Sequence, residues 1–117
     1  MSAEDLDGLA VEFSQLARRH YDATAVGDWK NANKAVKAID KVFRVIVTEG
    51  EVGRQRLLQL VDDADPAVVS MAAVYSMRYA PDRCQVVLRH LGTREDLLGF
   101  GARQAVERWN DGEWALE

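Results

Sequence analysis

Apolar residues recur at intervals of three or four along almost the whole chain, and this periodicity restricts the fold more than any other feature of the sequence. Such intervals match the 3.6-residue turn of an α-helix, whereas a half-buried strand alternates every second residue. A first stripe covers residues 6–21 and a second covers residues 29–46. Gly27 separates them, and Asp28 is suited to cap the second helix. The pattern therefore predicts an all-α protein.

The second of these helices is expected to bury one face that consists of six apolar residues: Trp29, Ala32, Val36, Ile39, Phe43 and Ile46. Residues 42–47 are rich in β-branched side chains, which leaves a strand as the alternative for that short segment. The spacing of three and four favours the helix, which Gly50 is placed to end.

The middle of the chain carries a clear helix start, in which Asp65 is the N-cap and Pro66 the first helical residue. A short leucine-rich helix closing at residues 57–61 and a turn of aspartates precede this start. The helix that follows Pro66 is small or apolar on nearly every side. A helix of this kind is packed on several sides, so we expect it at the centre of the fold.

Two further helices complete the chain. Pro81 begins the fifth, Gly92 ends it, and Thr93 with Asp96 is expected to form a capping box for the sixth. Phe100 falls opposite the apolar face of that last helix, so either the helix begins after Gly99 or Phe100 packs on a neighbouring element. These segments predict about six helices in a single domain, residues 1–117. The expected core consists of Leu6, Phe13, Ile39, Phe43, Leu57, Leu60, Ala72, Tyr75, Leu88, Leu91 and Val106.

Charge and cysteine content restrict the function classes. The formal net charge of -4 makes a general nucleic-acid binder unlikely in design, because such proteins carry a basic excess. The lone cysteine, Cys84, excludes an internal disulfide and fits a reducing cytoplasm. Residues 1–8 are acidic and do not resemble a secretory signal, and no apolar run approaches the roughly 20 residues that span a bilayer. We therefore expect a cytoplasmic protein.

The sequence contains no recognisable catalytic or metal-binding pattern. His20 and His90 each stand alone, without a second ligand at helical spacing. The aspartates at 62, 63 and 65 lack the glycine and the final glutamate of a calcium loop, so a helix-capping turn is the better interpretation. Gly99 and Gly101 lack the lysine of a phosphate-binding loop. We expect a protein that is not an enzyme and holds no metal or cofactor.

One charged feature is distinctive: the second helix carries a basic stripe with spacings of 4, 3, 4 and 3, formed by Lys30, Lys34, Lys37, Lys41 and Arg44. At about 100° per residue these side chains fall within a band of roughly 80° opposite the apolar face. The stripe is either a solvated helix face or a partner-binding surface. Neighbouring like charges repel by a few tenths of a kcal/mol, which an acidic protein face or a phosphate backbone would relieve.

Residues 57–81 resemble one HEAT repeat. They contain a leucine pair, an Asp-x-Asp-Pro turn, two valines, paired alanines and a closing proline. In such a repeat the turn starts the second helix and the alanines let two helices approach closely. HEAT-like folds stack antiparallel helix pairs, since one pair alone does not bury its apolar face. Val69 departs from the pattern, because HEAT helices often carry an arginine there.

A wider resemblance joins the helical start, the Asp-x-Asp-Pro turn, the run 98–100 and a terminal Trp-x-x-Gly-Glu at residues 109–113. Together they are similar to a family of small bacterial HEAT-like domains of uncharacterised function, often encoded beside polymorphic toxins. The resemblance implies an immunity protein that occludes a cognate toxin through a protein–protein surface. The alternatives are a HEAT-type adaptor or regulatory subunit of a larger assembly and, third, a HEAT-like nucleic-acid binder.

Overall fold

The computed structural model describes residues 1–114, and these contain six α-helices, one short 3₁₀ helix and no strand. This confirms the all-α class and the number of helices. It also excludes the strand alternative, because residues 42–47 are helical. The helices are α1 (Ala3–Ala25), α2 (Trp29–Val47), α3 (Glu51–Leu58), α4 (Pro66–Ser76), α5 (Pro81–Leu91) and α6 (Leu97–Asn110), with the 3₁₀ helix η1 (Gln59–Asp62) between α3 and α4.

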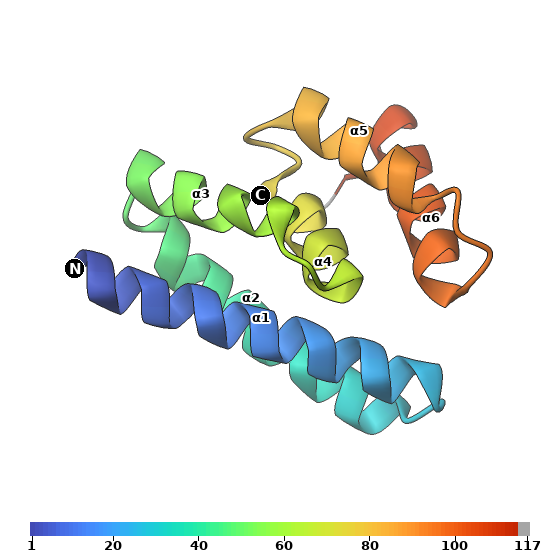
Figure 1. The fold of residues 1–117 in the computed structure, drawn as a ribbon, viewed down its shortest axis with the longest axis horizontal. Helices are drawn as coiled ribbons and strands as arrows, with labels where there is room; N and C mark the ends of the chain where they lie inside the picture. Colours follow the sequence, from blue (N-terminus) through green and yellow to red (C-terminus); the bar gives the residue numbers. More distant parts are fainter. Residues whose placement is uncertain (115–117) are drawn as a thin grey trace. The chain divides into compact units, whose positions relative to one another are not determined.

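The helices form two compact units, of which the first covers Met1–Leu60 and the second begins at Val61. In the first unit, α1 and α2 lie side by side as a long hairpin, and α3 contacts both (Figure 1). In the second unit, α5 packs against α4 and α6, and α4 also contacts α6. The single-domain organisation and the HEAT-like stacking of helix pairs stay predictions.

The hairpin of the first unit has a fully buried interior that includes Phe13 from α1 and Ile39 and Ile46 from α2. Gly50 takes a positive φ of 66° after α2 and turns the chain into α3. Gly53 then allows α3 to approach α2 closely, because a Cβ at this position would overlap the carbonyl oxygen of Ile46. The glycine at 50 therefore ends α2 as the sequence predicts.

The buried face of α2 differs from the expected one at two positions. Trp29 is 64% exposed and Val36 is 36% exposed, so the prediction that both are buried is wrong. The buried residues are Ala32, Ala35, Ile39, Val42, Phe43 and Ile46. This face is centred near Ile39, from which Trp29 and Val36 are rotated by about 80° and 60° on a helical wheel. Both therefore lie at the margin of the packed face.

The second unit is built around α4, in which no residue is exposed. The carboxylate of Asp65 accepts a hydrogen bond from the backbone N–H of Ala67 at 3.0 Å, and Pro66 is the first helical residue. The predicted helix start is thus confirmed. The paired alanines of the turn-and-helix motif, Ala72 and Ala73, are completely buried, as packing on several sides requires.

The start of α6 corrects two expectations. The helix begins at Leu97, and its N-cap is Asp96, whose carboxylate accepts a hydrogen bond from the backbone N–H of Gly99 at 3.1 Å. Thr93 is not the cap, since its hydroxyl donates to the carbonyl of His90 in the preceding helix. Both alternatives for Phe100 are wrong, because the helix includes Gly99 and Phe100 is 51% exposed. Nothing in this unit covers its ring.

The expected core is otherwise found inside the protein. All of its members are buried except Val106, which is half-buried. The deviation lies near the end of α6, where Trp109 on the same face is also half-buried.

Candidate partner-binding surface

The basic stripe of α2 is exposed along its full length. The side chains of Lys30, Lys34, Lys37, Lys41 and Arg44 all lie on the solvent side of the helix. They include every lysine of the chain. Within the described residues, no ion pair joins any of the five to a carboxylate. Their positive charge is therefore presented to solvent, with no internal acidic side chain to neutralise it.

Local structure holds this stripe straight. Asp28 caps α2 by accepting a hydrogen bond from the backbone N–H of Asn31 at 3.2 Å, and the helix then continues without interruption to Val47. From Lys30 to Arg44 the stripe is about 21 Å long at 1.5 Å per residue. The opposite side of α2 is packed on α1, so the basic side chains project from a supported helix.

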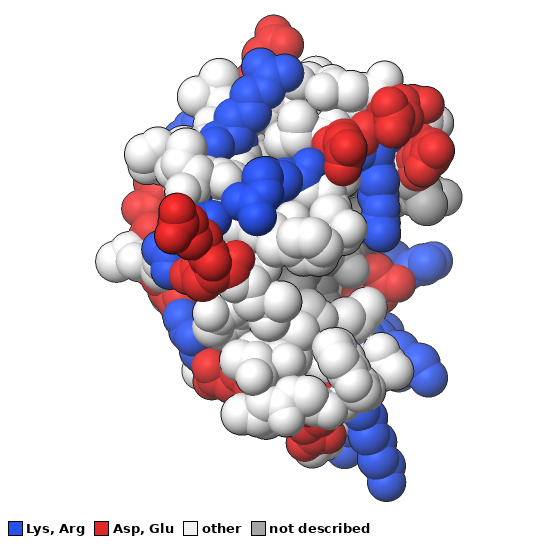
Figure 2. Space-filling model, turned by 90° about the vertical axis from the view of Figure 1, so that its right-hand side faces the viewer, with Lys and Arg blue, Asp and Glu red and all other residues white. Residues whose placement is uncertain are grey.

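The charge of the first unit is divided unevenly over its surface. Residues 1–60 contain nine basic and nine acidic side chains, so the unit as a whole is neutral while one face of α2 is strongly positive. Asp40, half-buried on α2, lies about 100° from Ile39 on the helical wheel, at the edge of the stripe. Figure 2 shows one face of the molecule on which acidic side chains gather in separate groups and basic side chains project between them.

An apolar margin runs beside the first turns of the stripe. It consists of Trp29, of Val36 two turns further along α2, and of Val26, which is 80% exposed in the turn before the helix. Gly27, with a φ of 73°, lets the chain reverse between Val26 and α2. Sequence reasoning missed this margin by assigning Trp29 and Val36 to the core. Their offset from the row through Ile39 was the signal that could have revealed it.

A groove of about 550 Å³ lies on the other side of the stripe, between α1 and α2. Leu16, Ala23 and Ala35 form its apolar floor, and Arg19 and Lys34 stand at its edge. The small side chains of the two alanines leave this part of the hairpin hollow. Lys34 thus belongs both to the stripe and to the rim of a concave surface.

The aspartate turn before α4 has structural partners. Asp62 forms an ion pair with Arg83 at 2.7 Å, and Asp63 accepts a hydrogen bond from the backbone N–H of Asp65 at 2.8 Å. Asp65 caps α4. Across the described residues, no three His, Cys, Asp or Glu side chains come together as metal ligands. The turn therefore acts as the helix-starting element that its spacing predicts.

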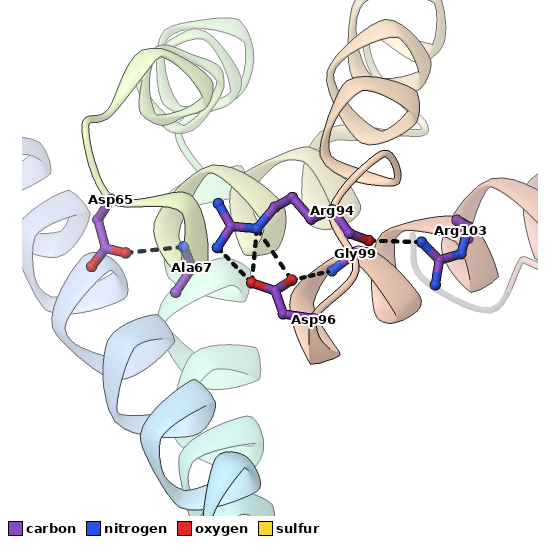
Figure 3. A network of polar contacts seen from close by, with 6 residues as sticks. All are labelled: Asp65, Ala67, Arg94, Asp96, Gly99 and Arg103. Carbon is purple, nitrogen blue, oxygen red and sulfur yellow. Dashed lines mark hydrogen bonds and ion pairs between the residues drawn. The ribbon is translucent and has the colours of Figure 1, made fainter.

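A second polar cluster closes the turn between α5 and α6 (Figure 3). The Arg94 guanidinium donates to the Asp96 carboxylate at 2.6 Å, and Arg103 donates to the carbonyls of Gly92 and Arg94 at 2.6 and 2.9 Å. The hydrogen bond from Arg94, with that from the N–H of Gly99, lowers the pKa of Asp96 to about 2. These contacts all stabilise the start of α6, so the cluster is structural.

The remaining groups with potential chemistry are unsuited to it. Burial raises the pKa of the Cys84 thiol to about 11, so the thiolate that a nucleophile or metal ligand requires is scarce at neutral pH. Burial also lowers the pKa of His20, which favours the neutral imidazole. Trp109 and Trp114 stack edge to face with ring centroids 5.6 Å apart, beside a small pocket of about 310 Å³ on α6.

Comparison with known proteins gives one informative result. The chain matches no protein-family model and no curated protein. It is similar in structure to the protein RPA1889 from Rhodopseudomonas palustris CGA009, whose crystal structure superposes with a TM-score of 0.85 over 96% of this chain and 93% of that chain. The two sequences are 16% identical. This likeness shows a shared fold.

The helices were also compared with the requirements of a bilayer. Within residues 1–114, none combines the length and the apolar character that crossing a membrane requires.

Proposed function

We propose that this chain is a protein-binding domain that uses the basic stripe of α2 to contact an acidic protein partner. The observation that carries the proposal is the exposure of five cationic side chains on one supported helix face, without an acidic partner among the described residues. Five like charges in a row repel one another, and a partner with carboxylates at matching positions would remove that repulsion. Electrostatic attraction of this kind also accelerates association.

The partner class follows from the resemblance to small HEAT-like domains encoded beside toxins. On that basis the chain is an immunity protein, and the partner is a cognate toxin whose acidic surface the stripe covers. Occlusion needs no catalytic group on this chain, only an interface of the usual 800 Å² or so per partner. A groove beside Lys34 would increase the area available for contact.

The first experiment is affinity capture from the native host with four forms of the chain. These are wild type, Lys34→Glu/Lys41→Glu, Lys34→Arg/Lys41→Arg, and a control with the same change of net charge, Arg89→Glu/Arg108→Glu. The two control arginines are exposed and lie on α5 and α6, away from the stripe. We expect one protein to be captured by every form except the Lys→Glu pair.

The captured protein is then produced in a test bacterium with and without this chain. A toxin will arrest growth, and co-production of wild type will restore it, whereas the Lys34→Glu/Lys41→Glu variant will restore it poorly. A captured protein that does not arrest growth would favour an adaptor or regulatory subunit instead. Undiminished capture by the Lys→Glu pair would contradict the proposal and identify the stripe as a solvated face. Salt-sensitive retention of DNA alone would favour the nucleic-acid binder.

A further inference from the structure

Trp29 is the most exposed aromatic side chain of the described residues, and it borders the basic stripe. It occupies the first position of α2, one residue before Lys30. An indole ring that is 64% exposed gains a large apolar contact when a partner covers it, at a low cost in conformational entropy. Tryptophan is accordingly enriched among the few residues that dominate interface energies.

The apolar margin and the stripe together form one two-sided surface. Val36 lies seven residues after Trp29, which places the two on the same side of α2 and about 10 Å apart along the axis. Lys30 and Lys37 follow Trp29 and Val36 by one residue each and repeat the same seven-residue interval. Each apolar side chain is thus adjacent to a cationic one, and the pattern continues over the first three turns.

We infer that α2 binds an acidic amphipathic helix of its partner, with Trp29 as the apolar anchor of the contact. This rests on the proposed function and names the chemistry of the partner. The stripe is straight, about 21 Å long, and has helical spacing, so carboxylates at spacings of three and four on a second helix would meet it in register. Apolar residues on the adjacent side of that helix would cover Trp29 and Val36.

A phosphate backbone matches this surface less well. Asp28 caps the helix beside Trp29, and Asp40 lies at the edge of the stripe. Nucleic-acid surfaces combine such aromatics with a basic excess, whereas residues 1–60 are neutral overall. An acidic helix tolerates these two carboxylates, since its own charges follow one row only.

The test uses a synthetic helical peptide of about 18 residues, long enough to cover the stripe at 1.5 Å per residue. It carries glutamates at spacings of three and four and leucines on the adjacent side. A second peptide has alanine in place of each leucine, and a single-stranded DNA of similar charge is the third probe. Binding is measured by titration calorimetry and by tryptophan emission at low and moderate salt.

Three variants accompany wild type: Trp29→Ala, Lys34→Glu/Lys41→Glu, and the matched control Phe100→Ala. Phe100 is an exposed aromatic on α6, outside the stripe and its margin. We expect the leucine peptide to bind wild type with a blue shift of emission that Trp29→Ala abolishes. Affinity is expected to fall about tenfold or more in Trp29→Ala. Phe100→Ala is expected to bind like wild type.

Several results would overturn the inference. Equal binding of the leucine and alanine peptides, or unchanged affinity of Trp29→Ala, would mean that Trp29 is no anchor. Binding of neither peptide would exclude a helical acidic partner. Tighter binding of the DNA would identify a nucleic-acid surface, and a concentration-dependent emission shift without any probe would identify a second copy of this chain as the occupant. Each of these leaves the capture experiment independent, so a toxin captured through the lysines would uphold the proposed function while this inference failed.

Discussion

The helices α2 and α4 each form the centre of a compact unit, but they are built in opposite ways. α2 is sharply two-sided, with a buried row through Ile39 and a cationic row opposite. α4 has no exposed residue and no charged side chain at all. One helix can therefore contribute a face to binding without losing its packing, whereas the other is fully used by the fold. In this protein, surface available for recognition is separated from the element that packs most completely.

The comparison has a second consequence for the two ends of each helix. Both start from an aspartate N-cap, Asp28 for α2 and Asp65 for α4. The cap of α4 is followed by proline and by buried side chains, while the cap of α2 is followed by the exposed Trp29. The same local chemistry thus starts a purely structural helix in one case and a candidate binding helix in the other.

The largest effect is expected from the buried row of α2. Phe43→Ala removes a side chain that is 5% exposed and is expected to cost about 3–5 kcal/mol of unfolding free energy, through lost burial and a cavity. Urea denaturation measures the change. Trp29→Ala on the same helix is the control and is expected to change stability by less than about 0.5 kcal/mol. Similar losses in both variants would mean that α2 is not two-sided.

Overpacking tests the complementary claim for α4. Ala73→Leu inserts a branched side chain where the native methyl is completely buried, and we expect a loss of about 1–3 kcal/mol. Val45→Leu, at an exposed position of α2, enlarges a side chain without this constraint. Thermal unfolding of the two variants distinguishes them. An α4 that accepts leucine at position 73 without loss would not be packed on all sides.

The caps provide a smaller effect. Asp65→Ala removes the acceptor for the N–H of Ala67 and is expected to lower stability by about 1 kcal/mol. Calcium is expected to leave the melting temperature of both forms unchanged, because the turn is a cap and no calcium loop. A calcium-dependent rise in wild type that disappears in Asp65→Ala would show that the aspartates bind metal.

The pH dependence of α6 follows from its own cap. Because the pKa of Asp96 lies at about 2 in the folded protein, below its ordinary 3.8, the charged carboxylate stabilises the fold. This contribution is complete above about 3.8 and is lost as the pH falls through about 2. Asp96→Asn keeps a capping oxygen but removes the charge. Its deficit in urea midpoint is expected to be constant near neutral pH and to shrink in that acidic window; a deficit independent of pH would contradict the assignment.

The smallest effect on stability is expected for the stripe itself. Lys34→Glu/Lys41→Glu removes like-charge neighbours on an exposed face, so the free energy of unfolding is expected to stay constant or to rise by a few tenths of a kcal/mol. Association with the captured partner is expected to slow by about tenfold at low salt. Stopped-flow or surface-based kinetics and a melting curve check both statements. A clear loss of stability would mean that these lysines support the fold.

Much of this structure could be predicted from the residues alone. The apolar periodicity defines the helices, and the start at Asp65–Pro66 and the stops at Gly50 and Gly92 lie where local chemistry puts them. The basic stripe was also visible, because charges at spacings of 4, 3, 4 and 3 must share one side of a helix. Its exposure is a finding of the structure, and its role in binding stays a prediction.

Other features depended on tertiary packing. Trp29 and Val36 are as apolar as their buried neighbours, and only the position of α1 against α2 decides which row is covered. Asp96 rather than Thr93 caps α6, because Arg94 and Gly99 bind its carboxylate. Local signals act over three or four residues and are legible in the sequence. The choice between adjacent rows of one helix depends on a partner helix far along the chain, so the apolar margin of the stripe could be recognised only in the folded protein.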